Sequence, residues 1–180
     1  MPATYIALGS NLPSAAGTPA DTLSAAVARL GSFGHVAARS ALYSTTPVGF
    51  SDQPRFLNAV VAFHTARAPH ALLTILLNIE QQFGRNRVAA VPNGPRTLDL
   101  DLLFYGDLVV SETGLEIPHP RLAERAFVLV PLNEIAPQLR HPCSGRTVNA
   151  MLQELAQRSG PLSLFATSAV NEQWTDKMSE

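Results

Sequence analysis

The chain has 180 residues, of which 46% are hydrophobic and 15% are charged, and its formal net charge is −1 at pH 7. A chain of this length can bury a sizeable core as one ordinary domain. The near-neutral charge argues against proteins that bind nucleic acid or anionic membranes through a broad basic surface.

The scarcity of cysteine and lysine restricts the possible compartments and nucleotide-binding motifs of the protein. Cys143 is the only cysteine, which excludes an intramolecular disulfide and suits a reducing compartment. No basic segment precedes a long apolar run near Met1, and no stretch approaches the length of a membrane span, so we expect a cytoplasmic protein. Lys177 is the only lysine, which excludes a Walker loop with its lysine directly after a glycine-rich turn.

The first third of the chain predicts a strand, a helix and a second strand. Residues 4–8 form a short apolar run that ends at Gly9-Ser10-Asn11. A loop rich in Pro, Gly, Ala and Ser follows, and Asp21 is a good N-cap for a helix that ends at Gly31. Residues 35–43 alternate weakly between apolar and polar, which suits a strand.

The middle of the chain predicts a long loop, a strand and a helix. Residues 45–54 are rich in turn-forming residues and predict an exposed loop before an apolar strand at residues 56–63. Pro69 stands where the first residue of a helix is expected, and a 3.6-residue apolar period continues from it to Gly84. Residues 85–93 lack any period and predict a surface loop.

The last part predicts a hairpin and two helices. Residues 98–104 indicate a strand, Gly106-Asp107 a hairpin turn, and residues 108–110 the strand that returns along it. A helix is expected over residues 122–134, broken near Pro131, and another over residues 148–157.

These elements follow the order βαββαβ with a C-terminal helical addition. That order is typical of the ferredoxin-like sandwich, an α+β fold in which helices pack on an antiparallel sheet. We therefore assign residues 1–158 to one domain and residues 159–180 to a tail. The tail is predicted to be partly disordered, with apolar side chains that can dock on the domain: Leu162, Leu164, Phe165 and Trp174.

The acidic pair Asp99 and Asp101 carries the most chemical information. Residues two apart on a strand point to the same face, about 6.5 to 7 Å apart, so both carboxylates project together while their leucine neighbours face the core. Hard oxygen ligands beside a phosphate-bearing substrate favour Mg²⁺. The alternative is that the pair is simply the solvent face of an edge strand.

Cationic residues surround this pair in the sequence. Arginines suit phosphate oxygens because the guanidinium group donates two parallel hydrogen bonds. Those before the pair are Arg85, Arg87 and Arg96, and those after it are His119, Arg121 and Arg125. The grouping predicts a magnesium-dependent enzyme that transfers phosphoryl groups from ATP, although each arginine taken singly also suits a solvated surface.

A flat heterocyclic substrate is suggested by an amide on an apolar strand. Asn58 offers donors and an acceptor that can read the edge of a ring, and an exposed asparagine at a strand start is the alternative. Phe56 and Phe127 are expected to be core residues on composition alone.

Several segments together resemble a known family. They are Ala7-Leu8-Gly9-Ser10-Asn11, Asp52-Gln53-Pro54, Phe56-Leu57-Asn58-Ala59, Ile79-Glu80, Gly84-Arg85, Gly94-Pro95-Arg96-Thr97-Leu98-Asp99-Leu100-Asp101-Leu102, Pro118-His119 and Pro131-Leu132. The chain resembles the 6-hydroxymethyl-7,8-dihydropterin pyrophosphokinases of folate biosynthesis over about residues 4–155. The resemblance implies transfer of the pyrophosphoryl unit of ATP to the pterin hydroxymethyl group, with release of AMP. It also implies two Mg²⁺ ions, ATP as co-substrate and a monomer.

The resemblance also implies roles for individual residues. The implied catalytic residues are Arg85, Arg96, Asp99 and Asp101, with both aspartates as metal ligands. Residues implied at ATP are Glu80, Arg85, Arg87, Arg96, Leu102, His119 and Arg125. Residues implied at the pterin are Thr45, Val48, Phe56, Asn58 and Phe127.

Three positions depart from the family pattern. Pro120 stands where an aromatic is common, Asn93 replaces a loop aromatic, and Leu77 replaces a polar residue that contacts ATP in relatives. The loop before Gly94 is also one residue longer. None of these changes removes a metal ligand.

Two other functions compete with this prediction. A phosphatase with an Asp-x-Asp nucleophile usually has a small hydroxyl residue two positions beyond the second aspartate, where this chain has Leu103. A ferredoxin-like RNA-binding module usually has basic strands with exposed aromatics, whereas this chain is slightly acidic.

Overall fold

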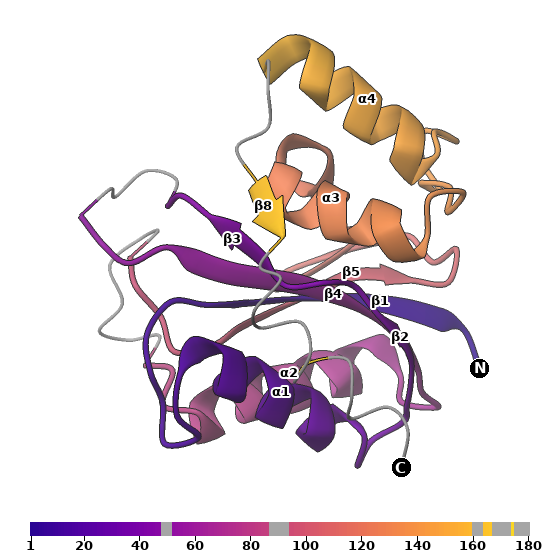
Figure 1. Ribbon diagram of the computed structural model, residues 1–180. Coiled ribbons are helices and arrows are strands. Elements are labelled where there is room, and N and C mark those ends of the chain that lie inside the picture. The colour runs from indigo at the N-terminus through magenta and orange to yellow at the C-terminus, as the bar shows by residue number, and fades with distance from the viewer. Residues whose placement is uncertain (48–51, 87–93, 160–163, 167–173, 175–180) are drawn as a thin grey trace.

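The computed structural model describes residues 1–47, 52–86, 94–159, 164–166 and 174, with the backbone alone at 164–166 (Figure 1). In chain order its elements are β1 (Ala3–Ser10), α1 (Pro19–Leu30), β2 (His35–Arg39), β3 (Tyr43–Thr45), β4 (Phe56–His64), α2 (Pro69–Gln82), β5 (Asp99–Tyr105), β6 (Val110–Glu112), β7 (Leu115–Ile117), the 3₁₀ turn η1 (Leu122–Glu124), α3 (Ala126–Ile135), α4 (Val148–Ser159) and β8 (Leu164–Ala166).

One antiparallel sheet organises the described part of the chain. Its strand order is β5-β1-β4-β3-β8, and β2 also pairs with β4, next to the β3 segment. The two βαβ halves therefore interleave so that β1 and β4 lie in the middle, with β5 beside β1. The predicted ferredoxin-like α+β fold is confirmed.

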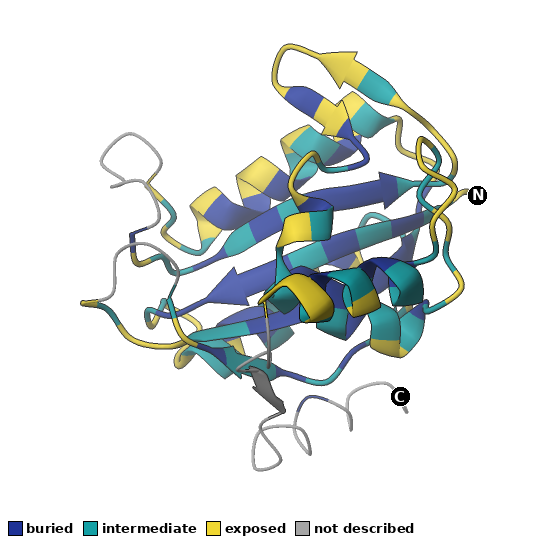
Figure 2. Cartoon of the chain, turned by 90° about the horizontal axis from the view of Figure 1, so that it is seen from above, coloured by how far each residue is buried: buried dark blue, intermediate teal, exposed yellow. Residues whose placement is uncertain are grey.

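Helices cover both faces of this sheet. In Figure 1, α1 and α2 lie below the strands while α3 and α4 lie above them. The central strand β4 reads FLNAVVAFH and is buried along most of its length, because both of its faces are covered. Figure 2, seen from above, shows buried residues along the strands and exposed residues on the outer turns of the helices.

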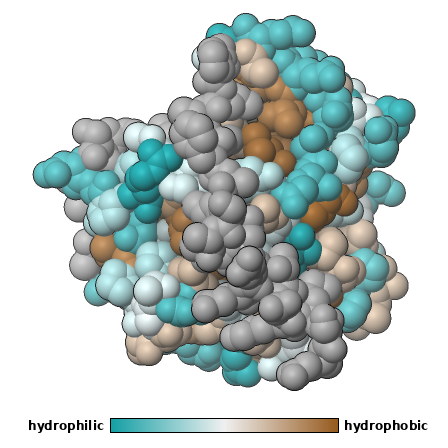
Figure 3. Space-filling view, viewed as in Figure 1, coloured by the Kyte–Doolittle hydropathy of each residue, from teal (hydrophilic) through white to brown (hydrophobic). Residues whose placement is uncertain are grey.

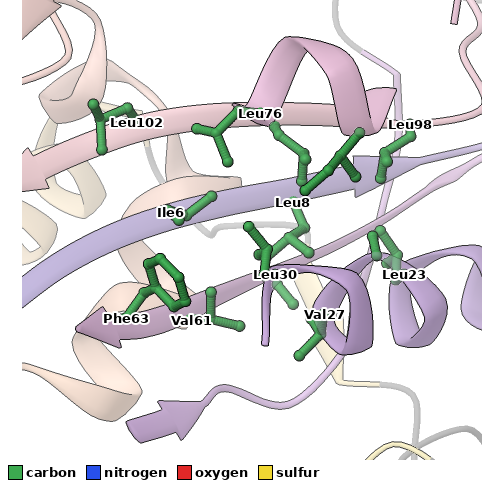
Figure 4. Close-up of a cluster of buried hydrophobic side chains, with 14 of the residues drawn as sticks. Ile6, Leu8, Leu23, Val27, Leu30, Val61, Phe63, Leu76, Leu98 and Leu102 are labelled. Carbon is green, nitrogen blue, oxygen red and sulfur yellow. The ribbon is translucent and has the colours of Figure 1, made fainter. Parts of the chain in front are cut away.

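The lower layer holds the larger apolar cluster. Side chains of β1, β4 and β5 meet those of α1 and α2 there, as Figure 4 shows for Ile6, Leu8, Leu23, Val27, Leu30, Val61, Phe63, Leu76, Leu98 and Leu102. A second cluster joins the upper face to α3 and α4 through residues such as Val60, Phe104, Leu129 and Met151. In Figure 3 a patch of hydrophobic residues shows beside these two helices, next to hydrophilic ones.

Two helix boundaries differ from the predicted ones. Thr18, not Asp21, is the N-cap of α1, and Asp21 is the N3 residue whose carboxylate accepts from the Thr18 backbone N–H, 2.9 Å away. This capping box begins the helix at Pro19, two residues before the predicted cap. Pro131 lies inside α3 and does not break it, and the predicted helix begins only at Ala126, after the separate turn η1.

Two strand predictions were also wrong. The segment predicted as one strand over residues 35–43 is divided between β2 and β3, which pair with different parts of β4. The predicted return strand at residues 108–110 does not pair with β5; β6 turns at Gly114, which has φ +85°, and pairs with β7. Glycine tolerates this left-handed conformation, so the tighter hairpin forms at Gly114.

Candidate active site

A cavity of about 260 Å³ opens on the upper face of the sheet, beside the start of α3. Its lining is Gly9, Thr45, Thr46, Phe56, Asn58, Arg85, Arg96, Asp99, Asp101, His119, Arg125 and Phe127. Gly9 pairs with Asn58 on β4 and with Asp99 on β5, so three neighbouring strands present residues to the same place. Ten of the fourteen predicted site residues thus meet in one cavity.

The acidic pair lies on β5 as strand geometry predicts. Asp99 and Asp101 line the cavity with side chains that are 23% and 31% exposed. Their neighbours Leu98, Leu100 and Leu102 are buried in the opposite, lower cluster. β5 is an edge strand, yet its two carboxylates face a cavity with cationic walls.

Each carboxylate is flanked by two basic side chains. Asp99 Oδ2 accepts a hydrogen bond from Arg96 Nη1 at 2.8 Å, and its other oxygen lies 3.6 Å from Arg85 Nη2. Asp101 Oδ2 lies 3.4 Å from Arg125 Nη1 and 3.9 Å from His119 Nε2. The repulsion between the two carboxylates is therefore offset by three guanidinium groups.

His119 is best described as neutral. Burial lowers the pKa of His119 below its usual value, and the nearby guanidinium groups of Arg125 and Arg121 lower it further, against the opposing effect of Asp101. His119 Nδ1 accepts from the Arg121 backbone N–H at 3.2 Å, so Nε2 carries the proton of the neutral ring. Nε2 lies 3.9 Å from Asp101 Oδ2, which is too long for a hydrogen bond.

Two arginines connect the carboxylates to the aromatic walls. The Arg96 guanidinium carbon lies 5.2 Å from the centre of the Phe56 ring, and that of Arg125 lies 5.7 Å from the centre of the Phe127 ring. Both distances are within cation–π range. Each arginine therefore touches one member of the acidic pair and one aromatic residue.

An amide group lies beside these rings. Asn58 is 6% exposed, and its Nδ2 donates to Thr45 Oγ1 at 2.8 Å across β4 and β3. A Cβ atom added at Gly9 would lie 3.1 Å from Asn58 Oδ1, so the glycine leaves room for this amide. Asn58 is thus held in one orientation on a strand that is otherwise apolar.

Four predicted residues do not belong to the described cavity lining. Glu80 is fully buried at the end of α2, where its Oε1 accepts from the Leu100 backbone N–H at 2.8 Å. It anchors β5 between the two aspartates. Leu102 is 5% exposed and packs in the lower cluster. Val48 and Arg87 lie outside the described residues.

Three residues next to the site were not predicted as site residues. Gly9 and Thr46 line the cavity. Asn11 is 2% exposed; its Nδ2 donates to Gln53 Oε1 and to the Pro54 carbonyl, while its Oδ1 accepts from the Arg96 backbone N–H at 2.8 Å. The Gly9-Ser10-Asn11 segment, which the sequence analysis noted at the end of the first strand, was the signal that could have found Gly9 and Asn11. Their place beside the cavity depends on pairing with residues far away in the chain.

The donor set fits a hard divalent cation. Asp99 and Asp101 supply carboxylate oxygens from one strand face, and Mg²⁺ commonly takes one or two carboxylates together with phosphate oxygens and water. Within the described ranges, no cluster of three or more His, Cys, Asp or Glu residues forms a complete protein cage for a metal. Among these same residues, no helix is long and apolar enough to cross a membrane.

Similarity to solved structures supports the fold. The chain matches the crystal structure titled Plasmodium falciparum HPPK-DHPS wild type with a TM-score of 0.67 and 15% sequence identity. The match covers 87% of this chain and 45% of that one. At this identity it shows a shared fold only.

Sequence similarity is closer. The chain is 45% identical over 157 residues to the 2-amino-4-hydroxy-6-hydroxymethyldihydropteridine pyrophosphokinase of Methylorubrum extorquens, covering 86% of this chain and 94% of the relative. It is 44% identical to the protein of the same name from Pseudomonas aeruginosa, covering 82% and 88%. It is 40% identical to the folic acid synthesis protein fol1 of Pneumocystis carinii over 85% of this chain, and spans only 20% of that longer protein.

A family model matches residues 5–137, which include every residue of the described cavity. That model describes 7,8-dihydro-6-hydroxymethylpterin-pyrophosphokinase. The matched residues include the acidic pair, its cationic partners and the amide-aromatic wall of the cavity. Because this match and the relatives agree, the chain belongs to the 7,8-dihydro-6-hydroxymethylpterin-pyrophosphokinase family.

Proposed function

We propose that the protein uses this cavity to transfer the pyrophosphoryl group of ATP to the hydroxymethyl group of 6-hydroxymethyl-7,8-dihydropterin. The reaction is proposed to require Mg²⁺ and to give the pterin diphosphate and AMP. One observation carries this proposal. A pair of carboxylates with cationic partners adjoins an amide and two aromatic rings in a single cavity, so polyphosphate and a flat heterocycle can bind side by side.

Asp99 and Asp101 are proposed to hold magnesium, with two ions expected. These two carboxylates would hold the ion, and its chemistry would be to neutralise the charge that develops on the phosphate oxygens during transfer. The carboxylates are presented by a β-strand whose backbone is anchored through Leu100 and Glu80, so their separation changes little.

Arg85, Arg96 and Arg125 are proposed to contact the phosphates of ATP. Each now lies within 4 Å of an aspartate, and a cation arriving between the carboxylates would weaken these pairs and free the guanidinium groups. Neutral His119 can donate its Nε2–H to a phosphate oxygen without adding charge. Arg87 is a further proposed ATP contact, whereas the side chains of Glu80 and Leu102 are buried outside the cavity and do not support the contact with ATP that the sequence predicted.

The pterin is proposed to stack between Phe56 and Phe127. Asn58, oriented by Thr45, can then read the polar edge of the ring through hydrogen bonds, together with the backbone of Val48. The arginines over the two phenyl rings would have to move aside as the pterin enters.

The reaction needs no nucleophile from the protein. The substrate hydroxyl oxygen attacks the β-phosphorus of ATP, the bond between that phosphorus and the oxygen bridging to the α-phosphate breaks, and AMP leaves. The hydroxyl proton passes to solvent or to a phosphate oxygen. The side chains align the reactants and stabilise the spread of charge, which are the main sources of rate in phosphoryl transfer.

The assay that tests this function separates two products. Purified protein is incubated with ATP, Mg²⁺ and the hydroxymethyl pterin, and nucleotides are separated by chromatography. AMP should form in equal amounts with pterin diphosphate, and EDTA should stop the reaction. Formation of ADP would indicate a simple kinase, and turnover unchanged by EDTA would contradict the magnesium proposal.

We also propose that the enzyme acts as a cytoplasmic monomer on these two small substrates, without a nucleic acid or membrane partner. One chain supplies the whole described cavity, and Cys143 is an exposed free thiol, which suits a reducing compartment. Light scattering at assay concentration tests the monomer.

A further inference from the structure

The C-terminal segment contributes to the sheet and to the core beyond the residues that the family model matches. That match ends at residue 137, whereas β8 and Trp174 come after α4. β8 extends the main sheet by pairing with β3 (Figure 1). Trp174 is only 1% exposed and belongs to the lower apolar cluster.

Trp174 is held at the break between β2 and β3. Its indole Nε1 donates to the Ser40 carbonyl at 2.7 Å, and the guanidinium carbon of Arg39 lies 5.4 Å from the centre of its ring. Arg39 Nη1 lies 3.4 Å from the Trp174 carbonyl oxygen. These contacts join Trp174 to Arg39, the last residue of β2, and to Ser40, which follows it.

The connection from β2 to β3 is held from its other side by α3. The Ala41 backbone N–H donates to the Glu134 carboxylate at 2.9 Å, and the Tyr43 hydroxyl donates to the same carboxylate at 3.0 Å. The break between the strands therefore lies between a helix of the domain and the C-terminal tryptophan.

β3 leads directly into the cavity. Tyr43 pairs with Ala166 and Thr45 pairs with Leu164, so β8 supports the whole of this three-residue strand. Thr45 is the partner that accepts a hydrogen bond from Asn58. Without β8, β3 would be a three-residue edge strand whose partner among the described strands is β4, with Tyr43 bonded to Glu134, and short edge segments of this kind open locally at low cost.

We infer that β8 and Trp174 are positioning elements for the pterin side of the cavity, which hold β3 so that Thr45 orients Asn58. This inference rests on the proposed role of Asn58 at the pterin. The described parts of the segment pair with β3 and contact Arg39 and Ser40, away from the acidic pair, so they should affect pterin binding and leave ATP binding largely unchanged.

Trp174 offers a direct test of docking, because it is the only tryptophan of the chain. Its emission should be blue-shifted and should resist acrylamide quenching in the full-length protein. Quenching as strong as in the urea-unfolded protein would overturn the docking.

Proline and alanine variants of β8 test the coupling to the pterin. Phe165→Pro, made together with Leu164→Pro, removes two successive backbone donors, one of which must face β3 because successive N–H groups of a strand point to opposite sides, whereas Phe165→Ala keeps the backbone able to pair. The double proline variant should raise KM for the pterin about fivefold to tenfold, the size of one or two hydrogen bonds no longer held in place, with KM for ATP within about twofold. The alanine variant should raise KM for the pterin less than the proline variant does.

Trp174→Phe and Trp174→Ala provide a second pair. The phenylalanine keeps most of the packing and loses the bond to Ser40, so it should raise KM for the pterin less than alanine does. Equal changes in KM for both substrates, or equal effects of the proline and alanine variants of β8, would overturn the inference.

Asn58→Ala separates this inference from the proposed function. If Asn58→Ala weakens pterin binding and the double proline variant does not, only the positioning role fails. If Asn58→Ala leaves pterin binding unchanged, the proposed role of the amide itself fails, whatever the quenching experiment shows about docking.

Discussion

The two sides of the cavity are built in different ways. The acidic side consists of Asp99 and Asp101 with their cationic partners, and its groups are joined by ion pairs between β5 and the segments around it. The pterin side consists of Thr45, Phe56, Asn58 and Phe127, and its polar groups are neutral and fixed by strand register. The acidic side must therefore rearrange when ligands bind, whereas the pterin side is already oriented.

Arg96 and Arg125 lie on the border between these sides. Each contacts an aspartate and an aromatic ring at once. Loss of their aspartate partners to a metal would also loosen their hold on the rings. The contrast between a side that rearranges and a side that is preformed can be tested by variants that affect one side at a time.

Asp101→Ala should give the largest effect. Removing one carboxylate leaves Arg125 without its acidic partner and removes half of the proposed metal ligands, so kcat should fall about a thousandfold or more. Asp107→Ala, at an exposed turn just beyond the same strand, is the matched control and should retain wild-type rates. Circular dichroism should show an intact fold in both. AMP formation at wild-type rate in Asp101→Ala would refute the metal assignment.

Asn58→Ala should affect the pterin side alone. The loss of a buried amide that pairs with the ring should raise KM for the pterin about 10- to 100-fold, with KM for ATP nearly constant. Steady-state kinetics with each substrate varied in turn measures the split. A matching rise in KM for ATP would mean that the two sides are not independent.

Gly9→Ala should act on the pterin side by crowding. The new Cβ would lie 3.1 Å from Asn58 Oδ1, so the amide must shift by a few tenths of an ångström, and KM for the pterin should rise a few-fold. The double variant Gly9→Ala with Asn58→Ala removes the crowded atom. Its effect should therefore be smaller than the product of the single effects, and simple additivity would contradict the proposed contact.

The pH dependence should give the smallest effect. Burial lowers the pKa of both His119 and His141, so the unfolded state binds more protons than the folded state as pH falls below the ordinary value of 6.5. Stability should therefore decrease toward acid over this range. Urea unfolding at several pH values should show a shallower decrease in His119→Gln and in His141→Gln.

These two variants also separate the site from the rest of the molecule. Protonation of His119 adds positive charge beside Asp101. His141 instead packs edge to face against the Phe104 ring, outside the cavity lining. Only His119→Gln should alter the acid limb of kcat against pH. An unchanged acid limb in that variant would remove His119 from the acidic side.

Local patterns predicted much of the fold. The helix after Pro69 and the strands at β1, β4 and β5 follow from apolar periodicity, which depends on near neighbours in the chain. The cap of α1 and the partner of β6 were predicted wrongly. In each case a nearby residue gave a more favourable local structure. Thr18 formed the capping box in place of Asp21 as N-cap, and Gly114 formed the tighter turn that pairs β6 with β7.

The acidic pair on one strand face, the arginines near it and the family resemblance could be predicted without a structure, because they depend on spacing and residue type. Long-range packing was needed to show that Gly9, Asn58 and Asp99 lie side by side, that Glu80 turns toward β5, and that Trp174 packs in the core. These are pairings between segments far apart in the chain. Their geometry is set by strand register and by packing against both sheet faces, and neither is a property of any local pattern.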